Sequence, residues 1–177
     1  TSTLVDLESK AKYASGCFTV IIQTHEEILI ATDTVRSFPV FYFKEDKHWI
    51  VSDDAYYLAD MIRNPELNET AGHEFLAAGY VTGKETLIKG VNQVQAGEII
   101  SLGKEETRQK FYFTFRTTGI LEYDYASMRT LAIKYTEDAF KKFIDSLQDR
   151  TVVVSLSGGY DSRLIAVMLK KYNYSKV

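Results

Sequence analysis

The stretch that decides the interpretation of this sequence is Thr151-Val152-Val153-Val154-Ser155-Leu156-Ser157-Gly158-Gly159-Tyr160-Asp161-Ser162. Its first five residues form a compact β-branched run, which is typical of a strand buried on both faces of a parallel sheet. After the loop, apolar residues return at helical spacing, at Leu164, Ile165, Val167, Met168 and Tyr172. The order of strand, loop and helix predicts the opening of an α/β domain.

The loop between the predicted strand and helix has the composition of an anion site. Where a helix begins, free backbone N–H groups and the positive end of the helix dipole face the same point. Gly158 and Gly159 have no Cβ, so the backbone can approach phosphate oxygens, and Ser157 and Ser162 add hydroxyl donors. The carboxylate of Asp161 would repel a bound polyphosphate unless a divalent cation lay between them, so its presence predicts magnesium.

The alternative interpretation of this loop is a plain strand-to-helix turn, with Asp161 as an acid favoured by the helix dipole. The loop also differs from a Walker A sequence, because no Gly-Lys-Ser or Gly-Lys-Thr follows the glycines. Transfer of a γ-phosphoryl group is therefore disfavoured.

The rest of the chain divides into a strand-rich part and a helical part. From Gly16 to Asp53, short runs rich in Val, Ile, Phe and Tyr predict an antiparallel meander of about four strands. Helices are expected at 55–63 and 71–80, and strand character returns over 94–115. An apolar residue at every third or fourth position then predicts one long helix, carrying Met128, Leu131, Tyr135, Ala139, Phe143 and Leu147 on one face.

The segment from Val154 to Ser162 resembles the pyrophosphate loop of the N-type ATP pyrophosphatases, in particular that of the asparagine synthetase family. In that family ATP is split between its α and β phosphates, a substrate carboxylate becomes an acyl-adenylate, and ammonia attacks to give an amide. The resemblance implies a nucleotide site formed by Ser155, Leu156, Ser157, Gly158, Gly159, Asp161 and Ser162. It implies Asp161 as the magnesium ligand. Arg163 departs from the small residue common at its place, which leaves the carboxylate substrate open.

Upstream segments resemble the second half of the same family's glutaminase domain. They follow the family's order, at 33–42, 50–53, 75–80, 86–91 and 96–98, so the likeness covers about 14–177. The resemblance implies an α+β fold followed by an α/β fold. Residues 1–118 would form the C-terminal half of a glutaminase-like domain of the N-terminal-nucleophile type, with two sheets between helical layers (αββα). Residues 119–177, beginning near Gly119, would open a domain like the adenine-nucleotide alpha-hydrolases.

In that family the glutaminase nucleophile is an N-terminal cysteine, which precedes the region that corresponds to Ala14. No catalytic glutaminase residue is therefore expected in this chain, which we interpret as a fragment or a reduced family member, inactive by itself. Cys17, the only cysteine, lies in an apolar run and is interpreted as a small hydrophobe. Arg36 replaces a family glycine and is interpreted as a solvated turn residue rather than a ligand contact.

These observations predict an asparagine-synthetase-like, ATP-dependent C–N ligase that uses Mg²⁺, a small-molecule carboxylate, and ammonia or glutamine. The alternatives are a relative similar to β-lactam synthetases or to cell-surface sugar amidotransferases, and a non-catalytic interaction module with a vestigial loop. Half of a two-sheet sandwich would expose a strand edge, so we expect a homo-oligomer.

Composition limits the partners and the cellular location that the sequence allows. The chain has 177 residues and a formal net charge of −3, and no dense block of Lys or Arg suits a nucleic acid. No apolar run approaches the roughly 20 residues that span a bilayer, and no signal peptide is evident at the start. We expect a cytoplasmic protein with neither nucleic acid nor membrane as a partner.

Overall fold

The structure is a computed structural model that describes residues 2–116 and 124–177. It divides into two compact units, Thr1–Arg116 and Thr117–Val177, each of which is described by itself. The boundary predicted near Gly119 lies outside the described residues. The described part contains α-helices and two antiparallel sheets, so the coarse prediction of a mixed α and β protein is confirmed.

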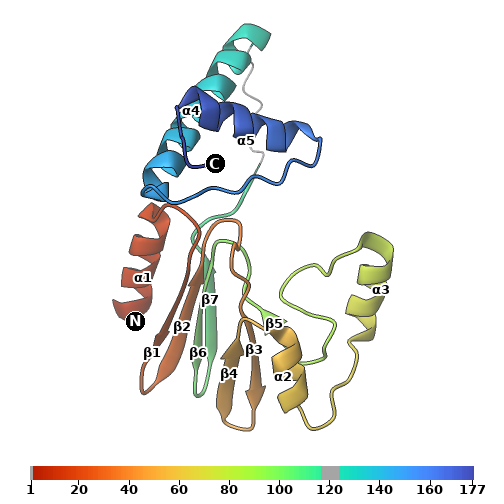
Figure 1. The fold of residues 1–177 in the computed structure, drawn as a ribbon. Coiled ribbons are helices and arrows are strands. Elements are labelled where there is room, and N and C mark those ends of the chain that lie inside the picture. The colour runs from red at the N-terminus through yellow and green to blue at the C-terminus, as the bar shows by residue number, and fades with distance from the viewer. Residues whose placement is uncertain (1, 117–123) are drawn as a thin grey trace. The chain divides into compact units, whose positions relative to one another are not determined.

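The first unit contains a four-stranded and a three-stranded antiparallel sheet (Figure 1). The larger sheet has the strand order β1-β2-β6-β7, with bounds Thr19–Gln23, Glu27–Thr32, Glu98–Gly103 and Thr107–Phe111. The smaller sheet has the order β4-β3-β5, with bounds His48–Ser52, Phe41–Glu45 and Asn92–Gln93.

The four strands predicted between Gly16 and Asp53 are all present, but they do not form one meander. β1 and β2 pair in the larger sheet, whereas β3 and β4 pair in the smaller one. The segment that joins β2 to β3 contains a turn anchored by Asp33, followed by Pro39, which has no N–H to offer a strand ladder. It therefore leads the chain from one sheet to the other.

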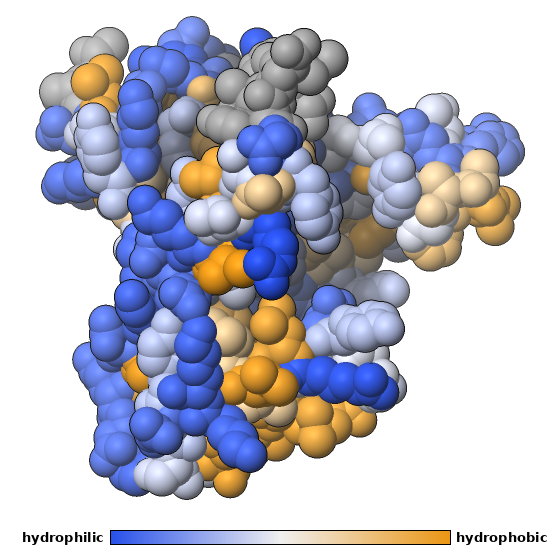
Figure 2. Space-filling view, turned by 90° about the horizontal axis from the view of Figure 1, so that it is seen from above, coloured by the Kyte–Doolittle hydropathy of each residue, from blue (hydrophilic) through white to orange (hydrophobic). Residues whose placement is uncertain are grey.

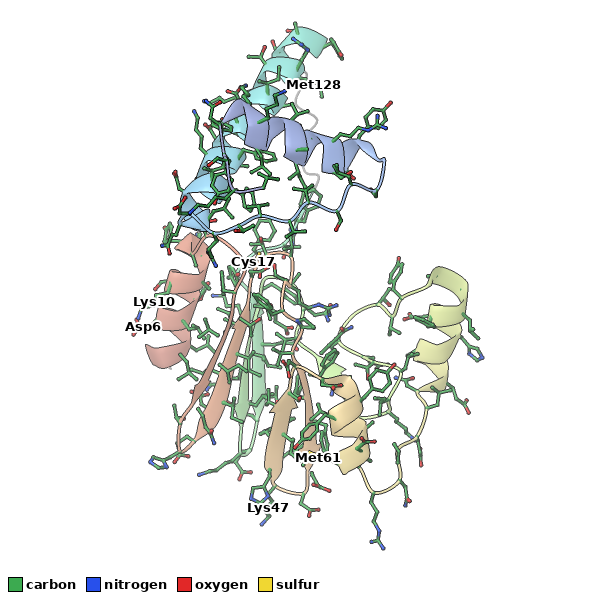
Figure 3. The ribbon with its side chains drawn as sticks, in the orientation of Figure 1. Asp6, Lys10, Cys17, Lys47, Met61 and Met128 are labelled. Carbon is green, nitrogen blue, oxygen red and sulfur yellow. The ribbon has the colours of Figure 1, made fainter. Side chains whose placement is uncertain are left out.

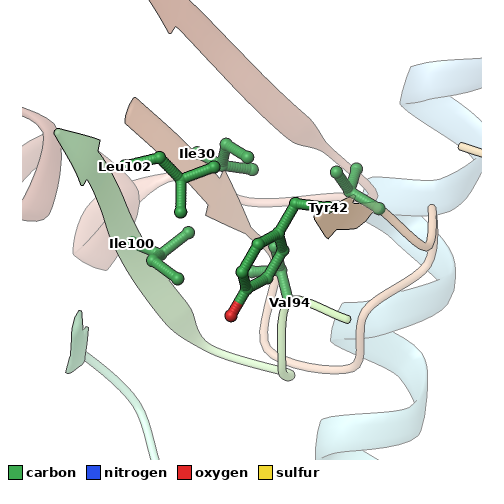
Figure 4. Close-up of a cluster of buried hydrophobic side chains, with 6 residues drawn as sticks. Ile30, Tyr42, Val94, Ile100 and Leu102 are labelled. Atoms are coloured by element: carbon green, nitrogen blue, oxygen red, sulfur yellow. The ribbon is translucent and has the colours of Figure 1, made fainter. Parts of the chain in front are cut away.

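The core of the unit lies between the two sheets (Figure 4). Ile30, Ile100 and Leu102 of the larger sheet pack against Tyr42 of the smaller sheet, and all four side chains are buried. The ring of Tyr42 also meets Trp49 edge-on, with centroids 5.9 Å apart. Each buried Leu or Ile contributes roughly 1.5–3 kcal/mol to folding, so this interface stabilises the stacking of the sheets.

Helix α1 (Ser2–Tyr13), which the sequence analysis did not predict, covers the other face of the larger sheet. Its Leu7 and Ala11 pack against residues of β2 and β6 that alternate with those of the first core. On the far side of the smaller sheet, Leu58 of α2 (Ala55–Met61) packs against Phe43. The layers of the first unit therefore run helix, sheet, sheet, helix (Figure 1).

Both short helices predicted after β4 are confirmed, and polar side chains mark where they begin. Asp54 accepts hydrogen bonds from two N–H groups in the first turn of α2, and Asn68 accepts one in α3 (Glu69–Ala78). Helix α3 ends at Gly79, whose φ of 81° is easily adopted only by a residue without a Cβ. The last two helices, α4 (Tyr125–Leu147) and α5 (Tyr160–Lys171), belong to the second unit and are also confirmed.

The strand predicted at 151–155 is wrong for this structure, because no strand forms between α4 and α5 in the described residues. The segment instead makes a single backbone–backbone hydrogen bond to another described segment. The N–H of Val152 donates to the carbonyl of Lys176 over 2.8 Å. Val152 and Val154 are half-buried while Val153 is 88% exposed, instead of buried on both sides. A strand needs a neighbouring strand for its ladder, and the described part of the second unit supplies none.

The apolar face of α4 is only partly covered. Of the residues predicted to lie on one stripe, Leu131 and Leu147 are half-buried, whereas Met128 and Tyr135 are exposed, and no residue of α4 is fully buried. Hydrophobic side chains open to solvent are visible among the hydrophilic ones in Figure 2.

Candidate nucleotide site

The loop singled out in the sequence leads directly into α5. Gly159 is the residue before the helix, with extended backbone angles of φ −75° and ψ 168°, and no side chain caps the helix. The first N–H groups of an α-helix have no partners within it. These donors therefore remain available to a ligand at the end of the helix that carries the positive partial charge.

Gly158 adopts a left-handed backbone conformation with open space beside it. Its φ is +82°, and a Cβ built on it would meet no atom within 4 Å. The open space beside Gly158 is therefore not filled by neighbouring residues of the described chain. A larger residue is disfavoured there by the backbone angle rather than by crowding.

Ser157 and Ser162 lie on the two sides of the bend, and their hydroxyl oxygens are 3.5 Å apart. Ser162 is buried, and its hydroxyl donates to the carbonyl of Gly159 over 3.3 Å. Both distances are long for O–H···O hydrogen bonds, so the two hydroxyl groups are weakly held. Ser157, Gly158, Gly159 and Ser162 thus lie together at the bend, and their role as an anion site stays a prediction.

Asp161 lies in the first turn of α5 and is exposed. Beside it, the guanidinium of Arg163 lies 6.0 Å from the ring centre of the exposed Tyr160. Within the described residues, no three His, Cys, Asp or Glu side chains are grouped so that they could hold a metal ion by themselves. Magnesium bound through one or two carboxylates and through substrate phosphates does not need such a group.

Leu156, which is 67% exposed, connects the loop with a cavity of about 510 Å³. The cavity is bordered by Val152 and Val154 on the extended segment and by Ala166 and Leu169 on α5. Its walls are mostly aliphatic, so it suits an apolar group. Ser155, predicted to lie near a nucleoside, is exposed and does not border this cavity.

Cys17 of the first unit is exposed (Figure 3) and lies just before β1, rather than being buried as a small hydrophobe. The apolar run around it does form the core, but through Phe18, Val20 and Ile22, which pack on the cluster under α1. The prediction that Cys17 is a core residue is therefore wrong. The chain turns at Gly16, whose φ is +99°, and this turn places the next residue outside the sheet.

Comparison with family models and with the curated proteins found no match to this chain. In the described part of the chain, no helix combines the length and the apolar character needed to cross a bilayer.

Proposed function

We propose that the bend from Ser155 to Ser162 binds the triphosphate of ATP together with Mg²⁺. In this proposal the second unit is the opening of an ATP-pyrophosphatase domain like that of the asparagine synthetase family. The observation that carries the proposal is the uncapped start of α5, where an extended Gly159 follows Gly158 in the left-handed region with open space beside it.

The donors at this bend suit phosphate oxygens. The N–H groups of the first turn of α5 have no capping side chain, and the hydroxyls of Ser157 and Ser162 make only long contacts with protein atoms. The N–H groups and the hydroxyls can therefore donate to a bound anion without the loss of a strong internal hydrogen bond. The dipole of the 12-residue helix favours a negative charge at the same point.

Asp161 is the residue that would hold the magnesium ion. It is exposed and makes no ion pair in the described part of the chain, so its carboxylate is free to share a cation with a bound phosphate. Magnesium would supply charge neutralisation of the phosphates when bound. Leu156 and the aliphatic cavity beside it offer apolar surface on the side where the resemblance implies the nucleoside.

The wider activity that we propose is carboxylate adenylation followed by amination, with ammonia or glutamine as the nitrogen source. The helix, sheet, sheet, helix layering of the first unit supports a glutaminase-like domain of the N-terminal-nucleophile type. The acceptor is a small-molecule carboxylate. The competing candidate is a non-catalytic interaction module, which is favoured by the large hydrophobic surface left open in the second unit.

Binding of Mg-ATP to the 177-residue chain separates the two candidates. In a titration followed by amide NMR shifts, we expect Mg-ATP to perturb residues 157–162 and the start of α5, and ATP with excess EDTA to act much more weakly. Asp161→Asn should lower the affinity for Mg-ATP by about tenfold or more, and Gly158→Ala should disturb the bend.

Asp145→Asn is the matched control, since Asp145 is an exposed acid on α4. It should leave the Mg-ATP response unchanged. A response that is absent, or that is equal in the wild type and in Asp161→Asn, would support the interaction module instead. Exchange of labelled pyrophosphate into ATP that requires a carboxylate would extend the result from binding to adenylation.

A further inference from the structure

A second cavity, of about 390 Å³, lies in the first unit, where β3, α2 and the segment after α3 meet. Four aromatic residues border it: Phe41, Tyr56, Phe75 and Tyr80. Tyr56 and Tyr80 are 82% and 62% exposed, so large parts of their rings are not used in packing. The volume lies in the range of small-molecule sites, which are mostly apolar with a few fixed polar groups.

The polar group of this cavity that stands out is the guanidinium of Arg36. Its Nη1 donates a hydrogen bond to Oε1 of Gln93, a residue that is only 9% exposed. The Nε2 of Gln93 in turn donates to the carbonyls of Gly83, at 3.0 Å, and Glu85, at 3.2 Å. These two bonds fix the amide so that its oxygen faces Arg36. The interpretation of Arg36 as a freely solvated turn residue is therefore wrong.

Arg36 retains hydrogen-bonding capacity after this contact. A guanidinium has five N–H donors, and none of the seven ion pairs between described residues includes Arg36. Glu85 is the acidic residue bordering the cavity, and its Oε2 accepts a 2.8 Å bond from the side chain of Asn68. The described residues thus give Arg36 a fixed position without neutralising its charge.

The backbone conformation of Arg36 is a further indication of a ligand site. Its φ is +55°, in the left-handed region that non-glycine residues adopt at a cost of about 1 kcal/mol or more. Glycine would avoid this cost, and strained residues of this kind cluster at ligand sites. Arg36 therefore adopts a strained backbone conformation and is held by a buried glutamine.

We infer that this cavity binds a small organic carboxylate with a flat apolar body. The guanidinium of Arg36 accepts the carboxylate in its planar fork of donors, and the aromatic rings of Tyr56 and Tyr80 cover the apolar body. The inference concerns the first unit alone and is independent of nucleotide binding at α5.

The test uses 3-phenylpropionate as the probe and its neutral amide, 3-phenylpropionamide, as the matched comparison. In NMR titrations we expect the acid to shift amides between Gly79 and Gln93, and to bind about tenfold more tightly than the amide. Arg36→Gly should abolish the preference for the acid. This variant should remain folded, because glycine adopts the positive φ freely, which offsets the loss of the hydrogen bond to Gln93.

Two further variants test the role of the aromatic rings and the specificity of the effect. Tyr80→Ala removes an exposed ring and should weaken the acid and the amide alike, whereas Arg129→Ala, on α4, should change neither. Equal affinity for the acid and the amide would overturn the inference. So would unchanged binding of the acid by Arg36→Gly, or shifts that lie away from the residues bordering the cavity.

Discussion

The carboxylate of Asp33 accepts a 2.9 Å hydrogen bond at Oδ2 from the backbone N–H of Phe18, and so ties the start of β1 to the end of β2. The same carboxylate accepts bonds from the N–H groups of Val35 and Ser37, which close the turn after β2. The carbonyl of Asp33 accepts from the N–H of Gly97 at 2.8 Å. One residue, only 2% exposed, therefore joins the approaches to three strands of the larger sheet.

Substitution of Asp33 should lower stability in a pH-dependent way. Burial by itself raises the pKa of the Asp33 carboxyl, but the N–H donors of Val35, Phe18 and Ser37 outweigh it and leave this pKa below its usual value. Asp33→Asn would place an amide where these donors need an acceptor. We expect it to lower the free energy of unfolding at pH 7 by about 1–3 kcal/mol, measured by urea denaturation.

The stabilisation by the Asp33 carboxylate should disappear at low pH. A carboxyl with a lowered folded-state pKa stabilises fully above its unfolded pKa, about 3.9, and the stabilisation is lost as pH falls through the folded pKa. The wild type should lose this contribution on acidification below about pH 4, and Asp33→Asn should lack it. Asp46→Asn, in the exposed turn between β3 and β4, is the control. Equal acid sensitivity of the wild type and Asp33→Asn would argue against the assignment.

Glu98 should show the opposite dependence on pH. It is 2% exposed, and burial raises the pKa of its carboxyl above 4.5, despite a 2.6 Å bond donated by the N–H of Gln95. A raised folded-state pKa means that stability falls as pH rises from about 4.5 through the folded pKa. Glu98→Gln cannot ionise and still accepts the bond from Gln95. Its Tm should exceed that of the wild type at pH 7 and match it near pH 4, and an equal Tm at pH 7 would count against a buried charge.

Two glycines with similar backbone angles provide a matched pair. Gly97 and Gly83 have φ of +66° and +68°, but a Cβ on Gly97 would lie 2.6 Å from the carbonyl oxygen of Phe113, whereas a Cβ on Gly83 would meet nothing within 4 Å. Both alanine variants suffer the strain of a positive φ, about 1 kcal/mol. Gly97→Ala also forces two backbone segments apart, so we expect it to lose about 2 kcal/mol more than Gly83→Ala in chemical denaturation. Similar losses would show that the backbone near Phe113 yields easily.

The local elements of this fold were predictable because their signals are local. Short runs rich in Val, Ile, Phe and Tyr predicted β1 to β4, and two helical stretches predicted α2 and α3, which begin after the capping residues Asp54 and Asn68. The division of four strands between two sheets was not predictable from the same signals, since it depends on the Asp33 turn and on long-range pairing with β6. The expected strand at 151–155 failed for a related reason, because a strand depends on partners distant in sequence.

The two candidate sites differ in how far the sequence could reveal them. The bend at Gly158 and Gly159 is contiguous, so its residues, spacing and helix were all recognisable beforehand. The cavity at Arg36 joins segments about 57 residues apart, through the bond to Gln93, and nothing near Gln93 in the sequence marks it. A replaced glycine was the one available signal, and its meaning emerged only with the positive φ and the buried amide partner.

The outer edge of β1 is chemically suited to pairing with a second copy of itself. The N–H of Thr24 donates to Glu27, and the carbonyl of Phe18 accepts from Asp33, so even-numbered residues of β1 direct their backbone groups to β2. The backbone groups of Thr19, Ile21 and Gln23 therefore point outward. The strand, Thr-Val-Ile-Ile-Gln, has no charge or proline of the kind that protects edge strands, whereas β7 at the opposite edge carries Arg108 and Lys110.

An antiparallel dimer centred on Ile21 would pair Thr19 with Gln23 of the second copy and bring no like charges together, in keeping with the two-fold symmetry of most homodimers. We expect light scattering to show a concentration-dependent dimer. Ile21→Lys should weaken this dimer by about tenfold or more, because it sets two lysines opposite each other at the symmetry axis. Ile21 is 51% exposed, so the variant should remain folded, and Val35→Lys, at a 75% exposed turn position, is the matched control that should leave the dimer intact. A wild type that remains monomeric at high concentration, or a dimer that Ile21→Lys does not weaken, would place the assembly surface away from β1.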